Sequence, residues 1–416
     1  MEQLQKREGG RALLIGVSCK RGAVYNSSEE TLRELSGLIE TAGGEAVCSL
    51  WQQRDTPDSA TYIGEGKVAE ARELCAAQEL DLVVFDGELS PSQLSNLERE
   101  IDCRVIDRSM LILDIFALHA VTSEGKLQVE LAQMKYTLPR LAGKGLALSR
   151  LGGGIGTRGP GESKLETDRR HIRARIAAVR RELDEVKKNR GEKRALRDRS
   201  GVPRVAIIGY TNAGKSTLLN YLTGAGVLSE DKLFATLDPT TRRLRLPQGM
   251  EIYLTDTVGL IRNLPHQFIE AFSSTLDELK YADLLLQMVD ASNPDCAAHI
   301  EVVEKLAGEL GAGAIPMVIA LNKCDREGEL PVHLPEAVPI SARTGQGVPA
   351  LLAALERELA KRMHACTVLL PFSEGQLLDR LHRGAQIERE EYLPEGVRLT
   401  LTVDDALYNR ISRYLQ

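Results

Sequence analysis

Two kinds of segment alternate through the first quarter of the chain. Short apolar runs with the length and β-branched content of buried strands occur at residues 12–15, 46–50, 82–85 and 104–106. Polar and apolar residues mix at helical spacing near residues 28–41, 67–79, 91–100 and 108–121. Regular alternation of strand and helix is typical of a parallel sheet covered by helices. The pattern therefore predicts an N-terminal α/β domain over residues 1–125.

The apolar period then changes to that of long helices. One stripe has spacings of four, three and four, and it consists of Leu127, Leu131, Met134 and Leu138. A coiled-coil seam follows, formed by Leu165, Ile172, Ile176, Val179, Leu183 and Val186. Between them, residues 143–161 hold eight glycines and no acidic residue, which predicts a long loop. Residues 126–200 are therefore predicted to form an antiparallel helical hairpin with a glycine-rich, basic loop.

The remaining chain divides into a second α/β domain and a small tail. Buried-strand runs at residues 205–208, 251–255 and 316–321 predict a domain over residues 201–362. The tail, residues 363–416, shows two strand patterns and two helix patterns, at 366–370, 376–387, 397–403 and 406–415. We expect it to be a small C-terminal α+β domain of unknown role.

A glycine-rich segment follows the first strand of the second α/β domain and precedes a helix-like stretch. It matches G-x-x-x-x-G-K-S, the phosphate-binding loop, and consists of Gly209, Tyr210, Thr211, Asn212, Ala213, Gly214, Lys215 and Ser216. Backbone N–H groups of such a loop surround the phosphates, and the helix N-terminus adds partial positive charge. Lys215 is expected to neutralise β- and γ-phosphate charge, and Ser216 to give an oxygen to Mg²⁺.

Three further segments lie at the ends of later predicted strands. The first is Asp256, Thr257, Val258 and Gly259. The second is Asn322, Lys323, Cys324 and Asp325, and the third is Ser341, Ala342 and Arg343. Asp256 would hold Mg²⁺ through water, and the Gly259 N–H would approach a γ-phosphate. Asp325 can accept two hydrogen bonds from guanine that adenine cannot offer, so the motifs predict a P-loop GTPase with Lys215, Asp256 and Gly259 as catalytic residues.

One switch element, with a threonine for Mg²⁺, must lie between Ser216 and Asp256. The polar threonine cluster there is Phe234, Ala235, Thr236, Leu237, Asp238, Pro239, Thr240 and Thr241. Spacing does not decide among Thr236, Thr240 and Thr241.

Several segments resemble the HflX family of the TRAFAC-class GTPases. They include the threonine cluster, Asp256-Thr-Val-Gly-Leu-Ile, Asp107-Arg-Ser-Met-Leu-Ile-Leu-Asp-Ile-Phe and Gly153-Gly-Ile-Gly-Thr-Arg-Gly-Pro-Gly-Glu. The resemblance covers roughly residues 11–345 and implies that Thr236 is the metal ligand of the threonine cluster, beside Ser216 of the phosphate loop. It also implies a GTPase that binds the large ribosomal subunit and separates ribosomal subunits.

The residue after Gly259 departs from the pattern of signalling GTPases. They place a glutamine there to orient the attacking water, whereas this chain has Leu260. Nearby substitutes are Arg262 and His266, both interpreted as surface residues. We expect instead a slow intrinsic reaction, completed by a partner or by a bound K⁺ that Asn212 helps to hold.

Composition is that of an ordinary globular protein. The 416 residues are 27% charged and 43% hydrophobic, with a net charge of −6. The seven cysteines are scattered without a C-x-x-C pair, which favours reduced thiols. No apolar run approaches the ~18 residues of a membrane span. We expect a monomer in the cytoplasm, with a fraction of the molecules associated peripherally with a membrane.

The second helix of the predicted hairpin is strongly basic. Residues 169–199 carry thirteen Lys and Arg against five Asp and Glu, a local net charge of +8. A charged helix face is often only solvated, but the asymmetry beside a basic loop favours an RNA-facing arm. The expected RNA-binding residues are Arg150, Arg158, Arg169, Arg170 and Arg173.

These features together predict a GTPase that binds GTP and GDP, contacts the rRNA of the large ribosomal subunit, and dissociates or rescues ribosomes. Two alternatives remain open. One is a regulatory G-protein switch that acts through protein partners, with the basic arm merely solvated. The other is an RNA-remodelling NTPase.

Overall fold

The computed structural model describes most of the chain, in two compact units. The described residues are 10–20, 27–149, 160–198, 202–224, 233–234, 236–262, 268, 278–326, 334–361 and 363–416. The first unit comprises Met1–Asp184, Glu230–Leu237 and Asn263–Ser273. The second comprises Glu185–Ser229, Asp238–Arg262 and Ser274–Gln416.

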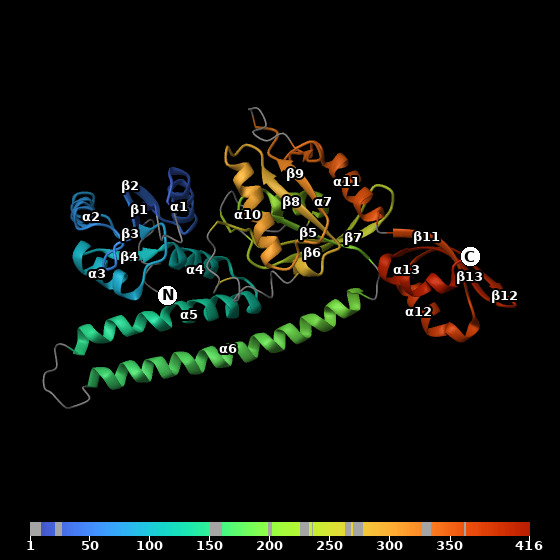
Figure 1. Cartoon of the computed structure of the whole chain (residues 1–416), viewed down its shortest axis with the longest axis horizontal. Helices are drawn as coiled ribbons and strands as arrows, with labels where there is room; N and C mark the ends of the chain where they lie inside the picture. Colours follow the sequence, from blue (N-terminus) through green and yellow to red (C-terminus); the bar gives the residue numbers. More distant parts are fainter. Residues whose placement is uncertain are drawn as a thin grey trace. The chain divides into compact units, whose positions relative to one another are not determined.

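A four-stranded parallel sheet forms the centre of the first unit, with order β2-β1-β3-β4 (Figure 1). Its strands are β1 (Arg11–Cys19), β2 (Glu45–Arg54), β3 (Leu82–Phe85) and β4 (Arg104–Asp107). The intervening helices are α1 (Glu29–Thr41), α2 (Glu65–Ala77), α3 (Pro91–Ile101) and α4 (Arg108–His119). Helices cover the sheet, so its inner strands are continuous apolar runs. The predicted strands and helices of this region are confirmed.

Local capping determines where these helices begin. Ser28 and Ser90 each form a capping box, with Thr31 and Gln93 as the third helical residues. Asp107 caps α4, because its carboxylate accepts a hydrogen bond from the Met110 N–H at 2.9 Å. Gly64 is the N-cap of α2 and makes no side-chain capping bond.

A buried ionic network joins the carboxyl ends of β3 and β4 to the neighbouring helices. Arg108, only 3% exposed, pairs with Asp86 at 3.1 Å and with Glu34 of α1. Asp107, fully buried, accepts hydrogen bonds from the Tyr136 hydroxyl at 2.6 Å and from Arg140 at 3.1 Å. Since an unpaired buried charge is costly, each member constrains the others. The Asp107-Arg108 pair of the family-like segment thus has a structural role in this unit.

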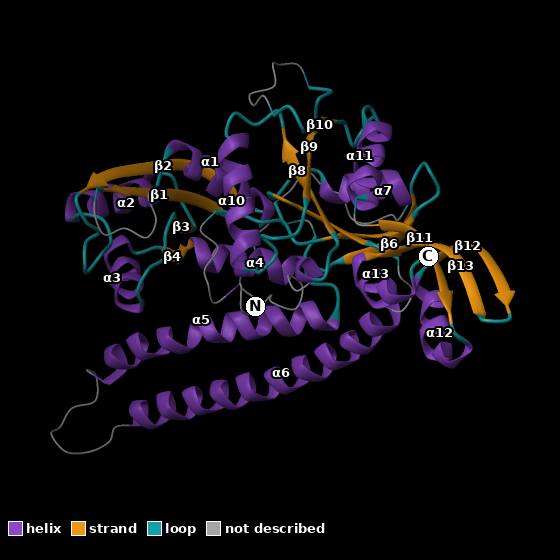
Figure 2. Ribbon diagram, turned by 45° about the vertical axis from the view of Figure 1, so that its right-hand side comes forward, coloured by secondary structure: helices purple, strands orange, loops and turns teal. Residues whose placement is uncertain are grey.

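Two long helices, α5 (Ser123–Ser149) and α6 (Pro160–Asp198), lie side by side as a hairpin in both views (Figures 1 and 2). Their shared apolar cluster contains the predicted stripe of α5 and four of the predicted seam residues, Ile172, Ile176, Val179 and Leu183. Arg175 of α6 donates two hydrogen bonds to Glu130 of α5, at 2.7 and 2.9 Å.

The predicted loop of the hairpin was too long. Helix α5 continues to Ser149, through Gly143 and Gly145, and α6 begins at Pro160. Glycine costs only about 1 kcal/mol relative to alanine in a helix, so a long helix can extend through isolated glycines. Proline at the first helical position is favourable because its missing N–H is not needed there.

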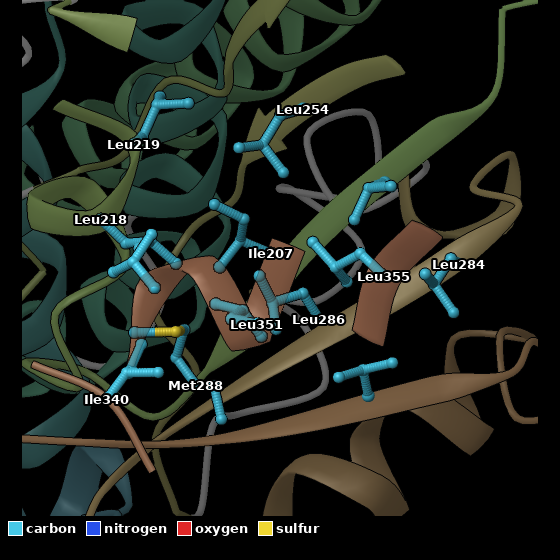
Figure 3. Close-up of a cluster of buried hydrophobic side chains, with 14 of the residues drawn as sticks. Ile207, Leu218, Leu219, Leu254, Leu284, Leu286, Met288, Ile340, Leu351 and Leu355 are labelled. Atoms are coloured by element: carbon cyan, nitrogen blue, oxygen red, sulfur yellow. The ribbon is translucent and has the colours of Figure 1, made fainter. Parts of the chain in front are cut away.

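A six-stranded sheet forms the core of the second unit, with order β10-β9-β8-β5-β7-β6 and only β6 antiparallel. Its strands are β5 (Arg204–Gly209), β6 (Thr240–Arg245), β7 (Glu251–Asp256), β8 (Leu284–Asp290), β9 (Met317–Asn322) and β10 (Val338–Pro339). The associated helices are α7 (Lys215–Thr223), α10 (Cys296–Glu309) and α11 (Val348–Ala360). Figure 3 shows Ile207, Leu286 and Met288 of the sheet packed with Leu351 and Leu355 of α11. This core holds the carboxyl ends of β5, β7, β8 and β9 at one edge.

The chain ends in a three-stranded antiparallel sheet with order β11-β13-β12 (Figure 2). Its elements are β11 (Met363–Leu370), η1 (Phe372–Glu374), α12 (Gly375–Gly384), β12 (Gln386–Leu393), β13 (Gly396–Asp404), α13 (Asp405–Ile411) and η2 (Ser412–Tyr414). The helix predicted at 376–387 was therefore wrong at its end, and β12 was missed. This edge strand is largely polar, so it lacks the apolar alternation that identifies a half-buried strand.

Candidate nucleotide-binding site

The predicted phosphate loop joins the end of β5 to the start of α7. Gly209 and Gly214 have φ of 155° and 92°, and Asn212 has φ of 61°. A Cβ added to Gly209 would lie 2.4 Å from the Met288 carbonyl oxygen, so only glycine fits there. At Gly214 the same atom would lie 2.2 Å from Asn322 Nδ2. The loop therefore approaches the ends of β8 and β9 as closely as backbone permits.

Lys215 is the first residue of α7 and is only 6% exposed. Its ammonium donates hydrogen bonds to the carbonyl oxygens of Gly209, at 3.2 Å, and Tyr210, at 3.0 Å. Burial lowers the pKa of Lys215 to about 8, while the nearby negative charge of Asp256 acts in the opposite direction. The side chain is thus held inside the loop, where phosphate oxygens are predicted to bind.

The predicted metal residues Ser216 and Asp256 are adjacent. The Ser216 hydroxyl donates to Asp256 Oδ2 at 2.6 Å, and Asp256 is fully buried at the end of β7. Thr257, the next residue, is anchored because its hydroxyl donates to the Ile207 carbonyl oxygen at 2.6 Å. Hydroxyl and carboxylate oxygens are ligands that suit Mg²⁺, so this pair fits the ion that the motifs imply.

Gly259 lies against the phosphate loop. A Cβ added to it would be 2.9 Å from Thr211 Cγ2 and 3.2 Å from Lys215 Nζ. Beyond Gly259, Leu260 and Tyr210 form an isolated parallel bridge. The structure thus brings the segment 256–259 and the phosphate loop together.

The two predicted base-reading segments also meet. The side chain of Asn322 donates to the Ala213 carbonyl oxygen and accepts from the Ala342 N–H, both at 2.8 Å. A hydrogen bond from the Ser341 side chain is the main reason that the pKa of Asp325 is lowered. Asn322 therefore ties the phosphate loop to both base-reading segments.

Two neighbouring side chains have structural explanations. Lys323 pairs with Asp290, at the end of β8, at 2.7 Å. The Cys324 thiol donates to the Leu321 carbonyl oxygen at 3.1 Å.

The predicted switch segment is divided between the compact units. Phe234, Thr236 and Leu237 belong to the first unit, whereas Asp238 belongs to the second, and Ala235 lies outside the described residues. Within the first unit the Leu233 N–H donates to the Thr41 hydroxyl oxygen at 3.2 Å, and Phe234 packs against α4.

The other two threonines considered for Mg²⁺ lie on β6. Thr240 is the cross-strand neighbour of Asp256, and the Thr241 hydroxyl lies 3.0 Å from that of Thr255.

The structure describes only some of the residues predicted to orient water in place of a glutamine or to bind RNA. Arg150, Arg158 and His266 lie outside the described residues. On α6, Arg170 and Arg173 are exposed and Arg169 is half-buried. The Arg262 side chain lies 4.0 Å from Asp295, at the start of α10. None of the helices in the described part of the chain has the length and apolar content to cross a membrane.

Sequence reasoning missed the partners of Tyr210. Its ring stacks on His299 of α10, and its hydroxyl accepts the N–H of Arg262. Neither partner is signalled by local sequence, because both are far along the chain.

Comparison with known proteins agrees with this geometry. Three family models match, described as GTP-binding GTPase N-terminal over residues 29–117, GTP-binding GTPase Middle Region over 119–197, and 50S ribosome-binding GTPase over 204–323. The GTPase HflX of Caldanaerobacter subterraneus subsp. tengcongensis is 47% identical over 415 residues, 100% of this chain and 96% of that protein. The GTPase HflX of Escherichia coli (strain K12) is 44% identical over 374 residues, 88% of each chain.

A looser likeness exists to a solved GTP-binding protein from Sulfolobus solfataricus in complex with GDP. It has 25% identity and a TM-score of 0.44, and it covers 85% of this chain and 99% of that one.

Proposed function

The chain belongs to the GTPase HflX family and hydrolyses GTP, and from this premise we propose that it binds the large ribosomal subunit and dissociates or rescues ribosomes. The observation that carries the proposal is the exposed basic surface of α6, where Arg170 and Arg173 face solvent. The family model over residues 204–323, described as a 50S ribosome-binding GTPase, supports the same partner. We place the protein in the cytoplasm as a monomer.

Lys215, Ser216 and Asp256 have geometry suited to holding GTP for hydrolysis. The buried Lys215 ammonium would exchange its two carbonyl partners for β- and γ-phosphate oxygens. Ser216 would bind Mg²⁺ directly and Asp256 would hold it through water, with Thr236 as a further ligand. Bound Mg²⁺ would neutralise charge that develops on the phosphates. Gly259 would donate its N–H to the γ-phosphate.

Guanine selection would come from the base-reading segments. The Asp325 carboxylate would accept hydrogen bonds from the base, and Ser341 would hold that carboxylate in place. Backbone of Ser341, Ala342 and Arg343 would meet the guanine oxygen. The Asn322 bridges keep these segments beside the phosphate loop, so base and phosphates can be held together.

The chain itself supplies no side chain at position 260 to orient water. Leu260 is 2% exposed and hydrophobic, so it can only shield the site. We propose that a partner, or a K⁺ ion held near Asn212, completes catalysis. Equal hydrolysis rates in Na⁺ and K⁺ buffers would remove the cation from this proposal.

The basic helix face would contact RNA phosphates rather than read bases. Exposed Arg side chains on a helix are suited to contact the phosphate backbone of a folded RNA. Binding through such phosphate contacts weakens strongly as the salt concentration rises. Arg170, Arg173 and Arg175 are all exposed, but Arg175 pairs with Glu130 of the same hairpin. The hairpin would therefore be needed for ribosome action but not for nucleotide binding.

Co-sedimentation with purified ribosomal subunits tests the proposal. We expect the protein to sediment with the large subunit, more strongly with a non-hydrolysable GTP analogue than with GDP. By linkage, the large subunit should raise affinity for the analogue by the same factor. If the protein bound the large subunit neither with the GTP analogue nor with GDP, the proposal would be overturned and a regulatory switch acting on proteins would be favoured. Binding to unstructured RNA with RNA-stimulated hydrolysis would favour an RNA-remodelling NTPase.

A further inference from the structure

The second residue of the phosphate loop is a deeply buried aromatic. Its position in G-x-x-x-x-G-K-S makes no demand on side-chain type, yet Tyr210 is only 5% exposed. Its ring stacks on the imidazole of His299, with ring centroids 3.7 Å apart and an interplanar angle of 6°. His299 is itself 9% exposed. This stacking fixes the direction in which the tyrosine hydroxyl points.

The hydroxyl of Tyr210 reaches the segment that follows Gly259. It accepts a hydrogen bond from the backbone N–H of Arg262 at 2.9 Å. Two backbone bonds join the same segments, from Thr211 N to Leu260 O at 2.8 Å and from Leu260 N to Gly209 O at 3.1 Å. The tyrosine thus extends a short backbone pairing by one further bond, which a side chain supplies.

This pairing restrains Gly259 from its C-terminal side. On the other side the chain is restrained by β7, which ends at Asp256. Between these supports, Gly259 lies so close to Thr211 and Lys215 that a Cβ would clash. A change in the pairing at residues 260–262 would therefore move the Gly259 N–H relative to Lys215.

We propose that Tyr210 is a positioning residue for the γ-phosphate. Its hydroxyl holds the segment 260–262 so that Gly259 presents its N–H beside Lys215, and His299 holds the ring. The inference rests on the proposed role of Gly259. Since GDP has no γ-phosphate, the positioning acts on GTP and on the transition state but not on GDP.

The test compares GDP with a non-hydrolysable GTP analogue on the full chain. Tyr210→Phe keeps the ring and its stacking but removes the acceptor oxygen. We expect the Kd for fluorescent GDP to stay within about twofold, and the Kd for fluorescent GppNHp to rise about three- to tenfold, as for one lost hydrogen bond. The kcat for GTP should fall by a similar factor. His299→Leu should shift the ratio of the two Kd values in the same direction.

A matched control is Tyr281→Phe, which removes the hydroxyl of a more exposed tyrosine (42%) in the same unit. It should leave both Kd values and kcat unchanged. A merely structural role for Tyr210 would lower Tm in Tyr210→Phe without moving the ratio of the Kd values, and this result would overturn the proposal. Equal weakening of GDP and GppNHp would also overturn it, because the tyrosine would then act on the whole loop.

The role of Gly259 is tested separately. If Gly259→Ala preserves the discrimination between GppNHp and GDP, the proposed Gly259 contact itself is wrong. If Gly259→Ala loses it and Tyr210→Phe does not, only the role of Tyr210 is wrong.

Discussion

Phe234 and Phe116 pack edge to face, with ring centroids 4.7 Å apart and an interplanar angle of 79°. Both rings are at most 2% exposed. Phe116 lies on α4 of the first unit, and Phe234 precedes the predicted metal ligand Thr236 by two residues. The switch segment thus has an aromatic anchor in the N-terminal region.

Weakening this anchor should release the segment without unfolding the unit. Phe116→Leu keeps apolar bulk but loses the edge-to-face contact, which is worth about 1 kcal/mol. We expect faster hydrogen exchange at residues 233–237, measured by mass spectrometry, while the strands of the first sheet stay protected. Phe372→Leu, at a position that is 60% exposed, is the control. Unchanged exchange at 233–237 would mean that Phe234 is not held by this contact.

Gly259→Ala should separate binding from hydrolysis. The new methyl group would lie within 3.0 Å of two Thr211 atoms and 3.2 Å from Lys215 Nζ, so the segment must move away from the loop. We expect near-normal GDP affinity and a kcat lowered by about 10² or more, as when one aligned backbone donor is lost. Gly308→Ala, in α10 with nothing within 4 Å of the new atom, should hydrolyse GTP normally. Normal kcat in Gly259→Ala would contradict the assignment.

Asp325→Asn should change base preference. The carboxylate is replaced by an amide that offers a donor where guanine also offers donors. We expect GTP affinity to fall on the order of 10² or more and xanthosine triphosphate to be accepted better. Ser341→Ala should weaken GTP binding less, because it removes only the hydroxyl that holds Asp325. Competition binding with GTP, XTP and ATP measures both effects, and wild-type GTP affinity in Asp325→Asn would refute the base-reading role.

Neutralising exposed arginines of α6 should weaken ribosome binding. Arg170→Gln with Arg173→Gln should leave GTP affinity intact and lower the salt slope of large-subunit binding by roughly one unit per lost phosphate contact. Arg175→Gln removes one positive charge, against two in the double variant, from an arginine that is already paired with Glu130. It should lower the slope by less than half as much as the double variant does. Equal slopes in all three proteins would indicate that the helix face is only solvated.

Asp114 predicts a pH-dependent stability. Burial raises the pKa of this carboxyl to about 6, with Arg104 acting in the opposite direction. As pH rises from 4 to 6 the unfolded chain releases the proton first, so the folded state loses stability in that window. Asp114→Asn should therefore be more stable than the natural chain above pH 6, by about 3 kcal/mol, and nearly equally stable at pH 4. Urea unfolding of both proteins at pH 4 and above pH 6 measures this difference in the free energy of unfolding. A difference that is independent of pH would contradict the raised pKa of Asp114.

Sequence patterns predicted most of the fold because the signals were local. Residues 82–85 and 105–106 are apolar on both faces of their strands, and the seam through Ile176 and Val179 repeats at helical spacing. The strand β12 was missed because its polar side chains lie at a sheet edge. Helix α5 extended past Gly143 because a local breaker signal is weaker than continued helical hydrogen bonding.

In the candidate site too, local motifs were predictable from the sequence and long-range contacts were not. The phosphate loop and the segments at 256, 322 and 341 follow known motifs, so their meeting at one sheet edge was predictable. Contacts across long sequence separations were not. Tyr210 with His299, and Leu233 with Thr41, depend on how whole elements pack, and no spacing within the sequence encodes them.

The division of the switch segment between the two units has a mechanical consequence. Phe234 is fixed in the first unit, and Thr240 is fixed in β6, opposite Asp256 in the second. The six residue steps between them can span at most roughly 20 Å when fully extended. Thr236 lies within this short connection, two residues after Phe234 and four before Thr240. The backbone on both sides of Thr236 is thus fixed within a few residues, by an aromatic contact at Phe234 and by strand pairing at Thr240.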